Sequence, residues 1–274
     1  MKINLPENID LAHPERYILA IYIRPDKFSF SLYNPVDDGS YFYWEIDNEQ
    51  HADAFSNFKD VFFENDFFTL PFRKIRLINH TSVFTYIPGL IYDDKHKKDF
   101  TNFLFSENTG KFLSHSLQSG ITILHQIPEE IYNFFSRTFV NPEFIHHSAP
   151  LIAYFQVKSS RVNALQMIVN KNGKEMNILC FSRGKFLLGN HFFCEQLQDA
   201  VYYILFIWKQ LKFDQLKDLL HIAGDTASKK ELPEQLKEYI YNIVPVNIVP
   251  EAHFDRIDTK NIPFELAALT LCEL

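Results

Sequence analysis

Two stretches decide the fold: residues 17–46 read YILAIYIRPDKFSFSLYNPVDDGSYFYWEI, and residues 164–190 read ALQMIVNKNGKEMNILCFSRGKFLLGN. Each stretch holds three runs of mostly β-branched and aromatic residues, separated by turn residues such as Asp38-Gly39 and Asn172-Gly173. Runs of this kind, divided by Gly, Pro, Asn or Asp, are typical of antiparallel strands joined by tight turns. The sequence therefore predicts a three-stranded meander in each half of the chain.

The elements after each meander follow in the same order. A helical pattern over residues 52–64 precedes a short strand over 75–79, and a helical pattern over 195–211 precedes a strand over 219–223. Matched strands are displaced by a nearly constant number of residues, which is the signature of an internal repeat. We therefore predict a duplicated β-β-β-α-β unit from the pattern of elements, with no side-chain identity to support it.

Both copies also end alike, in helix, strand and helix. In the second copy we predict a helix over residues 233–241, a strand over 243–249 and a last helix that begins at Phe264. That helix contains no Lys or Arg to attract anionic lipid, so we expect it to pack on the second domain. The predicted domains are residues 1–158 and 159–274.

Residues 82–127 have no counterpart in the second half. They read as a strand, a helix over residues 94–105 and two strands that pair across Ser119-Gly120. The pattern predicts a compact β-α-β-β module inserted in the first domain.

Charge and cysteine content exclude several classes of function. Lys and Arg number 27 against 34 Asp and Glu, for a net charge of −7, which disfavours nucleic-acid binding. The three cysteines form no CxxC pair, which points to a reducing cytoplasm. The amino terminus lacks the apolar core of a signal peptide. The longest apolar run, residues 200–208, is about half the length of a membrane-spanning helix, so we expect no membrane insertion.

Other candidate features have plain structural explanations. The aromatic run over residues 58–72 is an exposed docking patch or part of the core, and helical spacing favours the core. His146 and His147 are adjacent, so alternation along a strand would point them to opposite faces, and we predict no metal site there. Glu129 and Glu130 follow Pro128, as first-turn residues of a helix do. No nucleophile motif and no Walker A sequence is present, so no catalytic residue is assigned.

The order of elements resembles the actin-like ATPase fold, which is built from two RNase H-like domains. The inserted β-α-β-β module narrows the resemblance to the branch that contains FtsA and PilM, and the chain is most similar to an uncharacterised bacterial family with that fold. The resemblance covers nearly all of the chain. It implies an α/β protein with duplicated domains and a site for nucleotide phosphates between two β-hairpins.

The motifs that the resemblance implies are degraded in the first hairpin. In actin-like ATPases an Asp and a Gly begin each hairpin, where the carboxylate positions Mg²⁺ and the glycine amides hold phosphate. In the first hairpin the pattern Asp-x-Gly-Thr falls on Tyr22, Ile23, Arg24 and Pro25. Only Lys27 remains where such proteins often carry a phosphate-facing lysine.

The second hairpin and the adenosine-side turn are closer to the pattern. The Asp and first Gly of the second hairpin fall on Asn170 and Asn172, and Gly173 fits. The adenosine-side turn falls on Gly224 and Asp225. The resemblance thus nominates Lys27, Asn170, Gly173, Gly224 and Asp225 as residues of an interdomain cleft, with no metal ligand among them. We expect hydrolysis to be lost and tight Mg-ATP binding to be absent.

Three functional hypotheses follow. The first is a non-catalytic, cytoplasmic actin-like protein that binds an unknown protein partner through residues 82–127, the module that contacts partners in FtsA and PilM. The second is an ATPase or kinase-like switch that still uses a nucleotide. The third is a structural subunit of a larger assembly.

Overall fold

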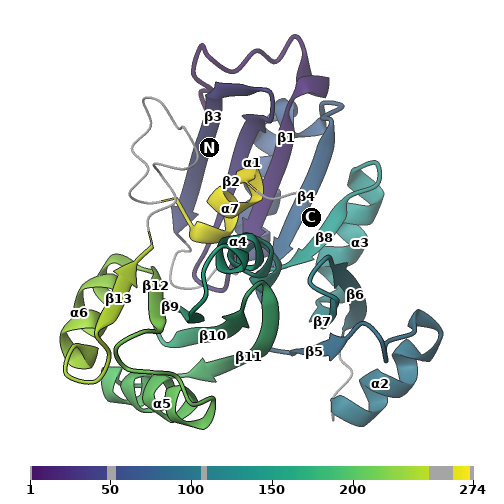
Figure 1. The fold of residues 1–274 in the computed structure, drawn as a ribbon. Coiled ribbons are helices and arrows are strands. Elements are labelled where there is room, and N and C mark those ends of the chain that lie inside the picture. Colours follow the sequence, from purple (N-terminus) through teal and green to yellow (C-terminus); the bar gives the residue numbers. More distant parts are fainter. Residues whose placement is uncertain (1, 48–53, 106–109, 247–261, 272–274) are drawn as a thin grey trace. The chain divides into compact units, whose positions relative to one another are not determined.

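The computed structural model describes residues 2–47, 54–105, 110–246 and 262–271 (Figure 1). The chain forms two compact units. Unit 1 contains the residues up to Ala149 together with helix α7 (Phe264–Leu271), and unit 2 begins at Pro150. Helix α4 (Ser148–Ser160) contains both this division, near its start, and the predicted boundary at residue 158, near its end.

Unit 1 is built on a five-stranded sheet in the order β3-β2-β1-β4-β8. The strands are β1 (Ile18–Ile23), β2 (Lys27–Asn34), β3 (Asp37–Asp47), β4 (Lys74–Asn79) and β8 (Glu143–His146). The first three are antiparallel, whereas β1, β4 and β8 run parallel. Helices α1 (Ala54–Glu64) and α3 (Glu129–Thr138) supply aromatic side chains to the core on one side of the sheet.

Unit 2 repeats this topology in the order β11-β10-β9-β12-β13. The strands are β9 (Leu165–Asn172), β10 (Glu175–Ser182), β11 (Lys185–Phe193), β12 (Leu219–Gly224) and β13 (Asn242–Pro245), and the helices are α5 (Leu197–Gln210) and α6 (Thr226–Leu236). Position by position, the directions of the strands match those of unit 1. The predicted duplication is therefore confirmed.

The inserted module is a three-stranded sheet in the order β5-β7-β6 with one α-helix. Its elements are β5 (Phe84–Pro88), a 3-10 turn (Asp94–His96), α2 (Lys97–Leu104), β6 (Lys111–Leu117) and β7 (Ile121–Ile127). Gly120, with a φ of 77°, makes the tight turn between β6 and β7. The predicted β-α-β-β module is confirmed.

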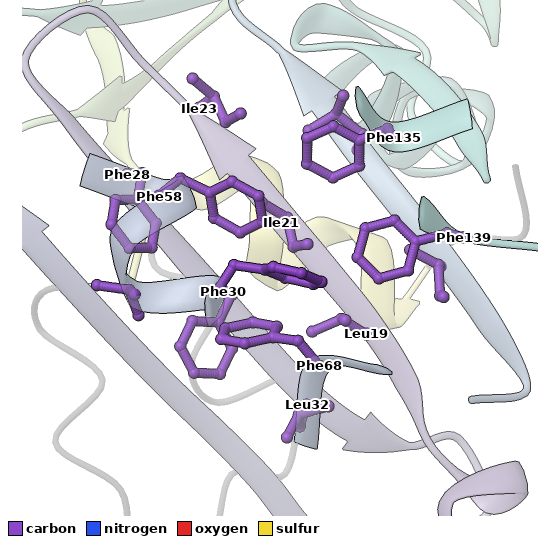
Figure 2. Close-up of a cluster of buried hydrophobic side chains, with 14 of the residues drawn as sticks. Leu19, Ile21, Ile23, Phe28, Phe30, Leu32, Phe58, Phe68, Phe135 and Phe139 are labelled. Atoms are coloured by element: carbon purple, nitrogen blue, oxygen red, sulfur yellow. The ribbon is translucent and has the colours of Figure 1, made fainter. Parts of the chain in front are cut away.

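The core of unit 1 is aromatic (Figure 2). Alternation along β2 places Phe28, Phe30 and Leu32 on the face that α1 covers. Phe58 of α1 is fully buried, and its ring contacts Phe28 at a centroid distance of 5.5 Å. Most of the aromatic run over residues 58–72 thus belongs to the core, as its helical spacing predicts, whereas Phe63 is 71% exposed.

Helix α6 differs from the prediction, which began the helix at Pro233. The helix begins seven residues earlier, and Pro233 lies inside it. The reason is the N-cap Asp225, whose carboxylate accepts a hydrogen bond from the Ser228 amide at 2.7 Å. This cap outweighs the proline, which normally prefers the first turn of a helix.

Helix α7 was expected to pack on the second domain, and that expectation is wrong. The helix packs against β2 in unit 1, where the Tyr33 hydroxyl donates a buried hydrogen bond of 3.2 Å to the carbonyl oxygen of Leu269. On this face of β2 the side chains of Ser29 and Ser31 are small and fully buried, which lets a helix approach closely. Among the described residues, no helix combines the length and apolar character that crossing a membrane requires.

Candidate functional site

Three of the five nominated residues meet at one end of the sheet of unit 2. Gly173 lies in the turn between β9 and β10, while Gly224 and Asp225 join β12 to α6. The amide of Asp225 donates to the carbonyl oxygen of Lys171 at 3.0 Å, which ties the two connections together. Gly224 has a φ of 106°, and a Cβ atom there would lie 2.0 Å from the Lys171 oxygen. Only glycine fits this approach of one backbone to another.

The Asp225 carboxylate holds both connections. One oxygen accepts the amide of Gly173 at 2.8 Å, and the other accepts the amide of Ser228 in the first turn of α6 at 2.7 Å. The amide that the resemblance assigns to phosphate binding therefore donates to a carboxylate of the chain itself. The same carboxylate also caps the amino terminus of α6. Free amides at the start of a helix are a common binding site for anions, and here the Asp225 carboxylate takes that place.

Asn170 lies on β9 beside these residues and opposite Ala223 of β12. Its side chain is buried, and its amide oxygen lies 3.5 Å from the side-chain nitrogen of Asn172. An asparagine amide carries no charge, so this position lacks the carboxylate that would position Mg²⁺ and its water.

Lys27, the fifth nominated residue, belongs to unit 1, at the start of β2. Its ammonium lies 3.1 Å from an oxygen of Asp47 and 3.6 Å from an oxygen of Glu45. Glu45 also accepts a short hydrogen bond of 2.5 Å from the Tyr43 hydroxyl. Burial and this contact raise the pKa of Tyr43. Carboxylates of β3 thus already balance the positive charge of Lys27.

Arg24 fills the turn between β1 and β2, at the position where the family pattern has glycine. Its side chain is 13% exposed, and its guanidinium lies over the Tyr22 ring at 5.3 Å and is 3.7 Å from Glu45. A long, charged side chain in this turn leaves no glycine amide facing a ligand, and Pro25 contributes no amide at all. The sequence alone shows that arginine replaces glycine here, but it does not indicate the ion pairs that Arg24 forms.

A group of four histidines lies where the inserted module joins the sheet of unit 1, and sequence reasoning missed it. This histidine joint consists of His80, His125, His146 and His147. The rings of His146 and His147 are both buried and lie 4.2 Å apart, and His80 stacks on His147 at 4.3 Å. The prediction that neighbouring histidines point to opposite faces is wrong, because β8 ends at His146 and the alternation ends with it.

The histidine joint is a packed contact in which burial disfavours the charged form of two rings. Burial lowers the pKa of His125 to about 3, and burial next to other histidines lowers the pKa of His146 well below its usual value. Asn79, the last residue of β4, donates to the carbonyl oxygen of Gln126 in β7 at 2.8 Å. In the described part of the chain, no group of three His, Cys, Asp or Glu side chains is arranged to hold a metal ion. The joint therefore attaches the module to β4 and β8.

Comparison with known proteins agrees with this fold. A crystal structure from Bacteroides thetaiotaomicron, described as a protein with actin-like ATPase fold and unknown function, is 28% identical to this chain. It superposes with a TM-score of 0.84 over 97% of this chain and 99% of that one. A PilM-PilN type IV pilus biogenesis complex matches at 11% identity and a TM-score of 0.59, over 94% of this chain and 98% of that one, which shows a common fold alone.

A search of curated proteins finds no match to this chain. A family model described as protein of unknown function, DUF3822, matches residues 6–243, which is most of the sequence. Duplicated sheets, an inserted β-α-β-β module and two structural relatives all indicate the actin-like ATPase fold. The chain belongs to the DUF3822 family and has this fold.

Proposed function

We propose that this protein is a non-catalytic member of the actin-like fold that acts by binding another protein. One observation carries the non-catalytic part of the proposal: the Asp225 carboxylate accepts the amide of Gly173 at 2.8 Å. A phosphate group would have to displace a carboxylate that is covalently part of the chain and already bonded to two amides. Loss of these charge-assisted bonds opposes nucleotide binding.

The turn of unit 1 supports the same conclusion. Mg²⁺ in phosphate-transfer sites is bound through carboxylates and substrate oxygens. The position that would carry the carboxylate holds Tyr22, whose hydroxyl contacts His80 at 3.1 Å. Arg24 brings a fixed positive charge to this turn, which disfavours a cation. The carboxylates of Glu45 and Asp47 are engaged by Lys27.

The protein-binding part of the proposal rests on the inserted module. Four large apolar side chains of this small module are exposed: Leu90 at 101%, Ile91 at 64%, Phe103 at 88% and Leu104 at 42%. Tyr92, next to Ile91, contacts Phe100 of α2 at a ring distance of 5.6 Å, so the loop after β5 lies against the helix. Large apolar side chains gathered on one small element are a common sign of a protein contact. The PilM structure of the same fold is likewise a complex with another protein.

The first test measures thermal unfolding with Mg-ATP and Mg-ADP at millimolar concentration. We expect the unfolding midpoint to equal that of a control with the same magnesium and ionic strength. A nucleotide at 100 times its dissociation constant would stabilise the protein by about 2.7 kcal/mol and raise the midpoint by several degrees. A rise of that size would overturn the proposal in favour of the nucleotide-dependent switch.

The second test concerns the module. Phe103→Asp places a charge on the exposed face of α2 and is expected to reduce at least tenfold the amount of partner that co-purifies with the tagged protein from its native cells. Val140→Asp is the matched control, because Val140 is 86% exposed in unit 1 outside the module. Both variants should keep the circular dichroism and unfolding midpoint of the wild type. Equal recovery of the partner with both variants would contradict a role for the module.

A further inference from the structure

A hollow of about 440 Å³ lies in unit 2, at the opposite end of the strands from Asp225. It is formed where β9 begins, where β10 turns into β11, and just before β12. Polar and charged side chains line it: Asn163, Ser182, Arg183, Lys185 and Asp218. Its volume lies within the range of small-molecule sites. The proposed function makes no use of this hollow.

Arg183 is held in place within this lining. Its Nε donates to the amide oxygen of Asn163 at 2.7 Å, which orients the guanidinium without using the N–H donors of its two terminal nitrogens. Arg183 also has a φ of 48°, and Gly184 after it has a φ of 78°. A two-residue turn with both φ angles positive favours Asn-Gly, so arginine is an unusual first residue here.

The lining carries a net positive charge. Lys185, the first residue of β11, is exposed at the rim of the hollow beside Arg183. Asp218 is the acidic residue of the lining, and its carboxylate already accepts the amides of Leu165 at 2.8 Å and of Asp214 at 2.7 Å. These bonds engage the negative charge of Asp218 with backbone amides, so the charges of Arg183 and Lys185 are not balanced by a second carboxylate of the lining.

We propose that this hollow binds a small molecule through an oxyanion group, a carboxylate or a phosphate. The terminal nitrogens of Arg183 match the spacing of two anionic oxygens, and Lys185 adds a second positive charge. Ser182 belongs to the same lining, and a serine hydroxyl is a further hydrogen-bond donor. The remaining volume accommodates the organic part that carries the anion.

The test uses two probes, inorganic phosphate and succinate, on the intact protein. Thermal unfolding is measured against sodium chloride at the same ionic strength, and isothermal titration calorimetry gives the affinity. We expect at least one probe to raise the unfolding midpoint by 2 °C or more at saturation. A rise with phosphate alone identifies a phosphorylated ligand, and a rise with succinate alone identifies a carboxylate. A rise with neither probe would overturn the proposal.

Arg183→Asn separates ligand binding from folding. Asparagine suits a positive φ, so the variant should unfold at the wild-type midpoint or above it while losing the response to the probe. Lys185→Gln should lower the affinity for the probe at least threefold. Lys209→Gln, at an exposed position of α5, should leave that affinity unchanged. An undiminished response in Arg183→Asn would show a general salt effect. A rise with Mg-ATP therefore counts against the proposed function only if it persists in this variant; a rise that disappears comes from the hollow.

Discussion

Replacement of Phe58 by alanine is expected to lower the free energy of unfolding by about 3–5 kcal/mol, the usual range for a buried aromatic residue. Phe58 is fully buried, and its ring lies 5.3 Å from Phe135 and 5.9 Å from Phe68 (Figure 2). These rings come from α3 and from the 3-10 turn after α1, so the cavity would open between three elements. Urea denaturation followed by circular dichroism measures the loss.

Phe63→Ala is the matched control for this experiment. The side chain is on the same helix but 71% exposed, so its removal should cost less than about 1 kcal/mol. A loss below about 1.5 kcal/mol in Phe58→Ala would show that the surrounding rings collapse into the space. The centre of the unit 1 core would then be less tightly packed than the structure indicates.

Acidification is expected to destabilise the protein through the histidine joint. The pKa values of His125 and His146 lie below 6.5 in the folded state because both rings are buried, whereas the unfolded chain titrates near 6.5. Below pH 6.5 the unfolded state therefore binds more protons, so stability is full above that pH and falls as the pH is lowered. Two such histidines predict a loss of about 2 kcal/mol between pH 6.5 and 5.5, with further loss toward pH 3.

Urea unfolding at several pH values measures the slope of the unfolding free energy against pH. His146→Asn removes one titrating ring and should reduce the slope between pH 6.5 and 5.5 by about half of the contribution that His125 and His146 make together. His96→Asn, at a side chain that is 64% exposed, should keep the wild-type slope. If His146→Asn also keeps it, protonation of the joint does not govern acid stability.

Much of the fold could be predicted from local sequence. Strands β1, β2, β9 and β10 are short runs of β-branched and aromatic residues between strong turn residues, which fixes both their position and their pairing. The duplication followed from the order of elements alone. The start of α6 differs from the prediction because proline usually marks the first turn of a helix. Here the N-cap at Asp225 sets the start, and Pro233 lies inside the helix. The packing of α7 depends on contacts between distant segments, which no local pattern encodes.

The candidate site could be predicted only in part. Gly173, Gly224 and Asp225 could be predicted because the resemblance indicates which turns of this chain correspond to the nucleotide-binding turns. The structure adds that the Asp225 carboxylate accepts a hydrogen bond from the turn at Gly173. The sequence shows only that His146 and His147 are adjacent; the histidine joint as a group has no sequence signal, since His125 comes from β7 and His80 from the segment after β4. The hollow at Arg183 was missed because a turn with arginine and glycine resembles any surface turn. Its positive φ is visible only in three dimensions.

The place of α7 in unit 1 has a consequence for synthesis on the ribosome. The strand that it covers, β2, is translated early, whereas Leu269 emerges only after the whole of unit 2. Until then, the small side chains on that face of β2 have no helix over them, and Tyr33 cannot make its bond to Leu269. Unit 2, whose described elements are consecutive in the chain, has no such delay. The half that is translated first is therefore the half whose folding is completed last.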